Sequence, residues 1–178
     1  MELRATFQIP TLIKAMTDVV MPAVDPDNKL AQEQAQLIVG CLHLMAQRLP
    51  LQYRYDRHEL KCFIALATEL QQEVGGSPAL AEALATLNQR ATSGQDVLAR
   101  AGAEPTELET ANLTLRDAVG QLIVAASVAD DDARRVAIDK AVMAHAKDQL
   151  LRERAWLALQ GWEGKDAKLP DVESLISG

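Results

Sequence analysis

Hydrophobic residues recur at three- and four-residue spacing along most of the chain, which is the pattern of amphipathic helices. Prolines, glycines and capping residues divide this pattern into successive blocks. The blocks predicted to be helical are residues 10–24, 29–49, 56–74, 78–101, 105–129 and 130–160. No stretch has a pattern that indicates a strand. We therefore predict an all-α, up-and-down bundle of five to six helices, several of them longer than 20 residues.

Local signals place the ends of these blocks. Asp27 or Asn28 is a suitable cap for the second block. Asp56 and Glu59 have the spacing of a capping box at the start of the third, and Gly75-Gly76 ends it. The Thr-Ser-Gly sequence at 92–94 either breaks the fourth helix or weakens it, and Gly161 closes the last.

The apolar stripes predict which residues face a core. In the first three blocks they are Leu12, Met16, Val19 and Val20; Leu30, Leu37, Ile38, Cys41, Leu42, Met45 and Leu49; and Leu60, Phe63, Ile64, Ala67, Leu70 and Val74. In the last three they are Leu80, Leu84, Leu87 and Ala91; Leu108, Leu115, Val119, Leu122 and Ala126; and Val136, Met143, Ala146, Leu150 and Leu157.

Some apolar residues lie off these stripes. They are Leu44 in the second block and Ile138 and Leu151 in the last. Because a twofold dimer covers such surface with one self-complementary patch, we expect a homodimer, with the face holding Ile138 and Leu151 as its contact. The alternative is a monomer in which the N-terminal segment or the C-terminal tail covers these residues.

Length and composition limit the class of protein. With 178 residues and 48% hydrophobic positions, we expect one domain over residues 1–162 and a partly irregular tail over 163–178, with a short turn near 172–176. The net charge of −7 argues against a nucleic-acid partner. The N-terminus lacks the apolar run of a signal peptide, and no run is long enough to span a membrane, so a cytoplasmic location is expected. Two cysteines make no disulfide framework.

Motifs that would indicate an enzyme or a cofactor are missing. No glutamate is followed by histidine three residues later, so the di-iron carboxylate pattern fails. The HExxH, Walker A, GxSxG and GxGxxG patterns are also missing. We expect no metal and no cofactor. The acids at 130–132 are interpreted as capping and solvated charge, with ion pairs four residues apart such as Asp131–Arg135 and Asp148–Arg152.

Three histidines remain as candidates for chemistry. His145 and Asp148 share a helix face, so the carboxylate is able to orient the imidazole as in general-base catalysis, although a surface pair is the simpler interpretation. His43 is interpreted as a core histidine rather than a catalytic base. His58 and Cys62 share a face and would form a thiol–imidazole pair, but no third group is identifiable, and each residue has an ordinary structural interpretation.

Two segments carry a family resemblance. They are AQEQAQLIVGCLHLMAQRL at residues 31–49, which follows a PAV turn, and AVMAHAKDQLLRERAWLAL at residues 141–159. Together they resemble a family of small helical bacterial proteins of unknown function, often encoded beside acyl-CoA dehydrogenases and aminoglycoside-phosphotransferase-like kinases. The resemblance covers about a quarter of the chain and does not extend to its middle. It implies an accessory protein and assigns no catalytic residue.

Two main hypotheses for function follow, beside a third in which the chain is a ligand-binding regulator domain without a DNA-binding head. The first is a non-enzymatic helical protein that acts through protein–protein contact, as a homo-oligomer or an accessory subunit. The alternative is an enzyme or small-molecule-binding protein with a pocket between helices, in which His145 and Asp148, or His43, supply the polar groups.

Overall fold

A computed structural model describes residues 4–164 and 166–177 and confirms the all-α prediction, with 83% of the structure helical and no strand in the described residues. The α-helices are α1 (Ala5–Ala15), α2 (Met21–Ala23), α3 (Lys29–Arg48), α4 (Gln52–Val74), α5 (Ala81–Ala99), α6 (Pro105–Val128), α7 (Asp132–Leu157) and α8 (Val172–Leu175). A π-helical turn, η1 (Met16–Val20), joins α1 to α2, and 3₁₀ turns occupy η2 (Leu49–Leu51), η3 (Pro78–Leu80) and η4 (Ala158–Gln160).

The chain divides into two compact units. The hairpin unit comprises Met1–Gln52 and Glu153–Glu173, and the bundle unit comprises Tyr53–Arg152 and Ser174–Gly178. The dividing points fall inside α4, α7 and α8 rather than at residue 162. The prediction of one folding domain over residues 1–162 stays a prediction.

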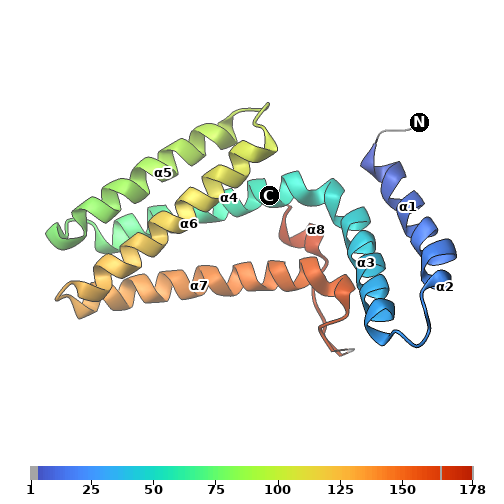
Figure 1. Ribbon diagram of the computed structural model, residues 1–178. Helices are drawn as coiled ribbons and strands as arrows, with labels where there is room; N and C mark the ends of the chain where they lie inside the picture. The colour runs from blue at the N-terminus through green and yellow to red at the C-terminus, as the bar shows by residue number, and fades with distance from the viewer. Residues whose placement is uncertain (1–3, 165, 178) are drawn as a thin grey trace. The chain divides into compact units, whose positions relative to one another are not determined.

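The bundle unit contains most of α4 and α7 together with all of α5 and α6, connected by short turns in up-and-down order (Figure 1). Its core is one continuous cluster of buried apolar side chains. The stripes predicted for blocks three to five supply most of it, and Leu60, Leu70, Leu87, Leu108, Leu115 and Leu122 are fully buried. A leucine- and alanine-rich periodic pattern was therefore sufficient to locate this core.

The ends of the bundle helices follow local chemistry. Gly76 adopts the left-handed conformation (φ +80°) that ends α4. Pro105 opens α6, and Glu104 and Glu107 form its capping box. The capping box predicted at Asp56 is wrong, because α4 already begins at Gln52, directly after η2. The Thr-Ser-Gly sequence does not break α5, since Gly94 is buried against leucine and isoleucine side chains of α4 and α6.

The hairpin unit is built differently. α1 packs against α3 (Figure 1), and Asn28 caps α3 by accepting a hydrogen bond from the backbone N–H of Ala31 at 3.0 Å. The first helix begins at Ala5 rather than at Pro10, which lies inside it. The buried apolar residues in this unit's described part are only Ile9, Ala35, Ala155 and Val172.

Three predicted core faces are wrong. In the first block, Leu12, Val19 and Val20 are exposed rather than buried. The stripe of α3 lies on the surface, where Leu30, Leu37, Ile38, Cys41, Met45 and Leu49 are exposed. In α7 the assignment is reversed: Ile138, predicted to lie in an exposed dimer contact, is only 1% exposed and joins the core, whereas Val136 and Met143 are exposed. Leu151 is half-buried. Both helices are apolar over a wide arc, so periodicity alone did not select the buried side.

Candidate functional site

A polar cluster lies between α4 and α7 in the bundle unit. The imidazole of His145 on α7 packs against the ring of Phe63 on α4, with 4.6 Å between centroids. On the neighbouring turn of α4, Glu59 accepts hydrogen bonds from Arg116 of α6 at 2.9 Å and from Gln149 of α7 at 3.2 Å. One carboxylate thus connects three helices beside the histidine.

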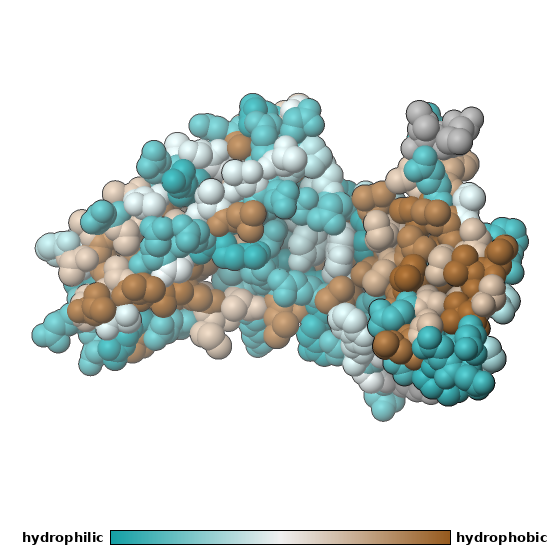
Figure 2. Space-filling view, in the orientation of Figure 1, coloured by the Kyte–Doolittle hydropathy of each residue, from teal (hydrophilic) through white to brown (hydrophobic). Residues whose placement is uncertain are grey.

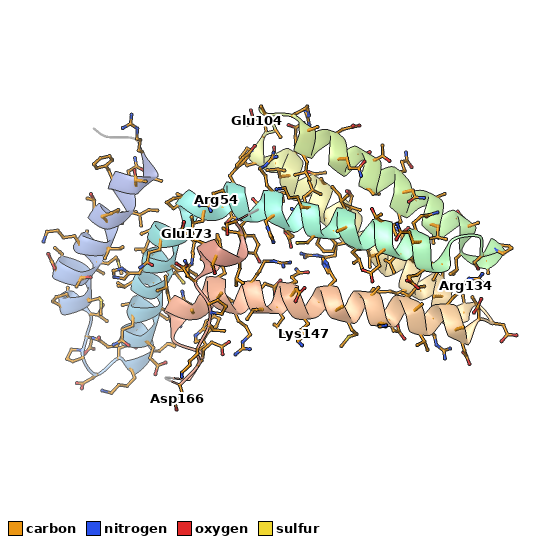
Figure 3. The ribbon with its side chains drawn as sticks, turned by 180° about the vertical axis from the view of Figure 1, so that it is seen from behind. Arg54, Glu104, Arg134, Lys147, Asp166 and Glu173 are labelled. Atoms are coloured by element: carbon orange, nitrogen blue, oxygen red, sulfur yellow. The ribbon has the colours of Figure 1, made fainter. Side chains whose placement is uncertain are left out.

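A cavity of about 230 Å³ opens next to this cluster. α4 contributes Cys62 and Glu69 to its lining, and α7 contributes His145, Asp148 and Arg152, together with small apolar side chains from both helices. Figure 3 shows α4 and α7 running alongside each other with side chains filling the space between them. Glu69 and Asp148 are exposed, and His145 and Cys62 are partly buried.

Arg152 is the most unusual member of this cluster. The residue is only 6% exposed, and its Nε atom is buried without a hydrogen-bond acceptor. Within residues 4–164 and 166–177 no carboxylate lies within ion-pair distance of it. Fully buried arginines are almost always paired, because desolvating an uncompensated charge is costly.

The surroundings favour the neutral forms of His58, His145 and Cys62. Burial, reinforced by the charge of Arg152, lowers the pKa of both His58 and His145 below the ordinary histidine value. Burial raises the pKa of the Cys62 thiol, although the charge of Arg152 opposes this shift. A thiol with a raised pKa forms little of the nucleophilic thiolate at neutral pH, which disfavours a catalytic Cys62–His58 pair.

The sequence-based candidates are only partly brought together. His145 and Asp148 line the same cavity, but no hydrogen bond joins their side chains among the described residues. The interpretation of His43 as a core histidine is wrong, because His43 lies exposed on α3 in the hairpin unit. Sequence reasoning missed Arg152 by interpreting it as the surface partner of Asp148. The available signal was its spacing: Arg152 lies two turns after His145, and this spacing places both residues on the same face of α7.

The acidic residues at the start of α7 behave as capping and ion-pair groups. The pairs that form are Asp131–Arg134 and Asp132–Arg135, three residues apart rather than the predicted four. Figure 3 shows Arg134 beside the turn between α6 and α7. In the part of the chain that the structure describes, no three histidine, cysteine, aspartate or glutamate side chains are grouped to hold a metal. Likewise, none of its helices is both long and apolar enough to span a membrane.

A second feature is the apolar surface of the hairpin unit. Eleven large hydrophobic residues there are between 43% and 74% exposed: Phe7, Leu12, Val19, Val20, Leu30, Leu37, Ile38, Met45, Leu49, Leu159 and Trp162. We call this set the hairpin surface. Figure 2 shows hydrophobic side chains gathered over α1 and α3. A hollow of about 370 Å³ lies within it, bordered by Leu37, Leu159 and Trp162.

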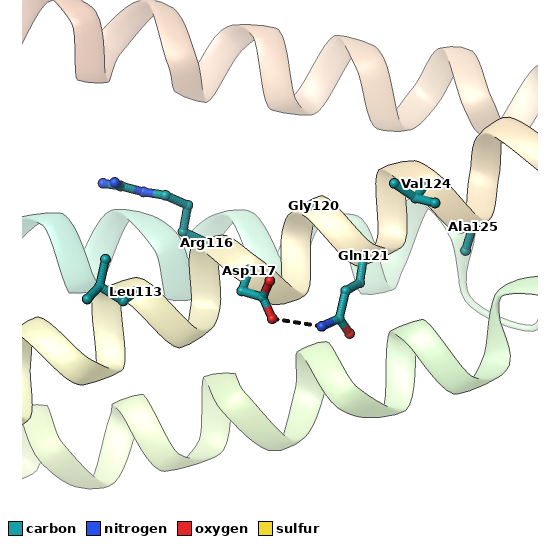
Figure 4. A pocket seen from close by; sticks show the side chains of 7 residues that line it. All are labelled: Leu113, Arg116, Asp117, Gly120, Gln121, Val124 and Ala125. Atoms are coloured by element: carbon teal, nitrogen blue, oxygen red, sulfur yellow. Dashed lines mark hydrogen bonds between the residues drawn. The ribbon is translucent and has the colours of Figure 1, made fainter.

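Another hollow, of about 770 Å³, runs along α6 (Figure 4). Every residue that lines it belongs to α6, including Gly120 and Val124, and Gln121 donates a hydrogen bond to Asp117 at 2.7 Å. Because no second helix contributes a wall, this is an open surface groove rather than an enclosing site. It lacks the converging polar groups of the cavity beside Arg152.

No protein-family model, curated protein or solved structure matches this chain. The resemblance to small helical bacterial proteins therefore stays a prediction, and the site must be interpreted from its own geometry.

Proposed function

We propose that this protein is a non-enzymatic helical interaction protein that associates through the hairpin surface, with a second copy of the chain as the partner. The observation that carries the proposal is the concentration of exposed apolar side chains on a unit that buries very few of its own. Large exposed apolar patches mark interaction sites on proteins.

The size of the hairpin surface matches what a dimer needs. Fully burying one large aliphatic side chain is worth roughly 1.5–3 kcal/mol, at ~25 cal/mol per Å². Eleven such residues, each about half exposed, thus represent roughly 400–700 Å² and on the order of 10 kcal/mol. A standard interface covers about 800 Å² per partner, and association itself costs about 4–15 kcal/mol. These quantities support a dimer with a dissociation constant in the micromolar range.

Charge within the pair of helices α1 and α3 is compatible with a second copy as the partner. Residues 4–52, which include both helices, contain four basic and four acidic residues. Two such helix pairs therefore meet without net like-charge repulsion between them. Two antiparallel helix pairs related by a twofold axis also form a four-helix arrangement, a common way to bury apolar helical faces.

The test is the mass of the protein in solution at increasing concentration. We expect twice the mass of one chain at micromolar concentration, and a single-chain mass for Leu37→Glu and Met45→Glu. Gln89→Glu adds the same charge to an exposed position of α5 in the bundle unit, away from the hairpin surface, and should remain dimeric. Because all three residues are exposed, the substitutions should leave the circular dichroism spectrum unchanged.

Two results would contradict the proposal. A single-chain mass for the unmodified protein up to about 100 μM would rule out self-association of useful strength. Dissociation by Met143→Glu, on the exposed side of α7 in the bundle unit, but not by Leu37→Glu would place the contact elsewhere.

A further inference from the structure

The cavity between α4 and α7 holds a positive charge without a partner. Arg152 lines it and is more than nine-tenths buried, and its Nε atom has no acceptor. Nδ1 of His58 and Nε2 of His145 are also buried without hydrogen-bond partners. Unsatisfied buried polar atoms are uncommon in folded proteins, and three of them in one neighbourhood indicate a missing binding partner.

The missing partner should carry a negative charge. A guanidinium group offers N–H donors in a planar fork that matches a carboxylate group. A neutral imidazole such as that of His145 supplies one further donor or acceptor, depending on its tautomer. Water alone would satisfy the hydrogen bonds but would not compensate the buried charge.

The rim of the cavity restricts the choice further. Glu69 on α4 and Asp148 on α7 are exposed and stand at the cavity's edge. Together with Arg152 they give the lining a net charge of −1 when His145 is neutral. This balance disfavours a dianion such as phosphate. It favours a molecule with a carboxylate at one end and an ammonium group at the other.

The volume of the cavity sets the size of the molecule. At ~30 Å³ per water molecule, 230 Å³ corresponds to about seven waters. An amino carboxylate with about seven non-hydrogen atoms occupies a similar space.

We infer that this cavity binds a small amino carboxylate, whose carboxylate group pairs with Arg152 and whose ammonium group lies near Asp148 and Glu69. The inference does not depend on self-association through the hairpin surface. It gives the alternative hypothesis of a small-molecule-binding protein a specific site and a ligand class. It assigns no reaction, because the structure offers no activated nucleophile beside the cavity.

The test uses the full chain and three probes: γ-aminobutyrate, butyrate and inorganic phosphate. Backbone amide NMR signals are followed during titration to about 20 mM of each probe. We expect saturable shifts with γ-aminobutyrate, confined to α4 and α7 near Cys62, His145 and Arg152, with a dissociation constant on the order of 1 mM or tighter. Butyrate lacks the ammonium group and should bind about fivefold more weakly, a loss typical of exposed charge pairs. Phosphate should bind more weakly still.

Variants separate the contributions of the two ends of the ligand. Arg152→Met should abolish the shifts, and Arg152→Lys should weaken them while keeping the charge. Asp148→Asn, at an exposed position, should remove most of the preference for γ-aminobutyrate over butyrate, because it weakens γ-aminobutyrate binding without weakening butyrate binding. Arg135→Met removes an exposed arginine from the same helix and should change nothing.

Several outcomes would overturn the inference. One is the lack of saturable shifts with any probe while the spectrum shows a folded protein. A second is unchanged binding by folded Arg152→Lys and Arg152→Met. If Arg152→Met fails to fold, equal binding of γ-aminobutyrate and butyrate by the unmodified protein, or an unchanged preference in Asp148→Asn, would exclude the assigned orientation.

Discussion

The ring of Phe63 lies against the imidazole of His145, with 4.6 Å between their centroids and 46° between their planes. This contact joins α4 to α7 and removes the imidazole from water. Burial is the main cause of the lowered pKa of His145, and the charge of Arg152 adds to it. The side chain of Gln149 and the charge of Asp148 oppose the shift, while the charge of Arg116 reinforces it.

The lowered pKa of His145 makes the stability of the fold depend on pH. An unfolded histidine has a pKa of about 6.5, so the unfolded chain binds the proton at a higher pH than the folded one does. The stabilisation is therefore complete above about pH 6.5 and is lost as the pH falls through the lower folded pKa. His58, whose pKa is also lowered, acts in the same direction.

Urea unfolding at about pH 7.5 and about pH 5 measures this effect. We expect the free energy of unfolding to fall at the lower pH, and the fall to be smaller in His145→Gln. His43→Gln removes an exposed histidine on α3 and should retain the full difference. An identical pH dependence in His145→Gln and the unmodified protein would contradict the assignment.

Leu122 tests the core of the bundle unit. It is fully buried on α6 among leucines of α4 and α5, so Leu122→Ala should lower the free energy of unfolding by about 2–5 kcal/mol. Val124→Ala on the same helix removes an exposed side chain and should change stability by less than about 0.5 kcal/mol. Similar values for the two variants would mean that the buried side of α6 is wrongly identified.

Two helical glycines should respond differently to a methyl group. A Cβ atom at Gly120 on α6 meets nothing within 4 Å, so Gly120→Ala should stabilise the protein by about 0.5–1 kcal/mol through helix propensity. A Cβ atom at Gly94 on α5 would lie 3.2 Å from Leu60 Cδ1 and 3.4 Å from Leu115 Cδ1. Because these neighbours must shift, Gly94→Ala should lose most or all of that gain. Thermal unfolding measures both effects. Equal stabilisation by the two substitutions would show that the side chains around Gly94 move to accept a methyl group without a cost in stability.

The sequence predicted the buried sides of α4, α5 and α6 well because their stripes are narrow and bounded by clear stop signals. Leu60, Leu87 and Leu115 each lie on a stripe flanked by polar residues, which leaves one buried side. α3 and α7 were assigned the wrong faces because apolar residues cover a wide arc of each. In α3, Leu37 and Met45 have the spacing of core residues, but the hairpin unit has too few helices to cover them.

The sequence predicted one part of the candidate site, the shared face of His145 and Asp148, but not the burial of Arg152. His145 and Asp148 share a helix face by spacing alone, and the structure places both at one cavity. The burial of Arg152 depends on how α4 packs across α7, and no local pattern encodes that packing. A lysine or arginine four residues after an acid is usually a solvated surface residue, which made the simpler interpretation the wrong one here.

Arg48 offers a test of the hairpin unit itself. Its Nε atom donates a hydrogen bond to the carbonyl of Trp156 at 2.9 Å, and its Nη2 atom donates one to the carbonyl of Ala155 at 3.1 Å. Its guanidinium carbon lies 5.7 Å from the centroid of the Trp156 ring. The last carbonyl groups of a helix lack partners within the helix, so this arginine satisfies two of them and places positive charge at the negative end of α7.

Removing Arg48 should therefore loosen the end of α7. Arg48→Ala should lower stability by about 1–3 kcal/mol, since two partly buried carbonyl groups lose charge-assisted hydrogen bonds. Arg48→Lys keeps the charge but cannot donate to both carbonyl groups in the same geometry. Its stability should lie between that of Arg48→Ala and that of the unmodified protein. Hydrogen exchange measures the effect locally: amides of residues 155–160 should exchange faster in Arg48→Ala, while those around Leu122 stay protected. Unchanged exchange at residues 155–160, or an equal rise in both regions, would contradict a local capping role.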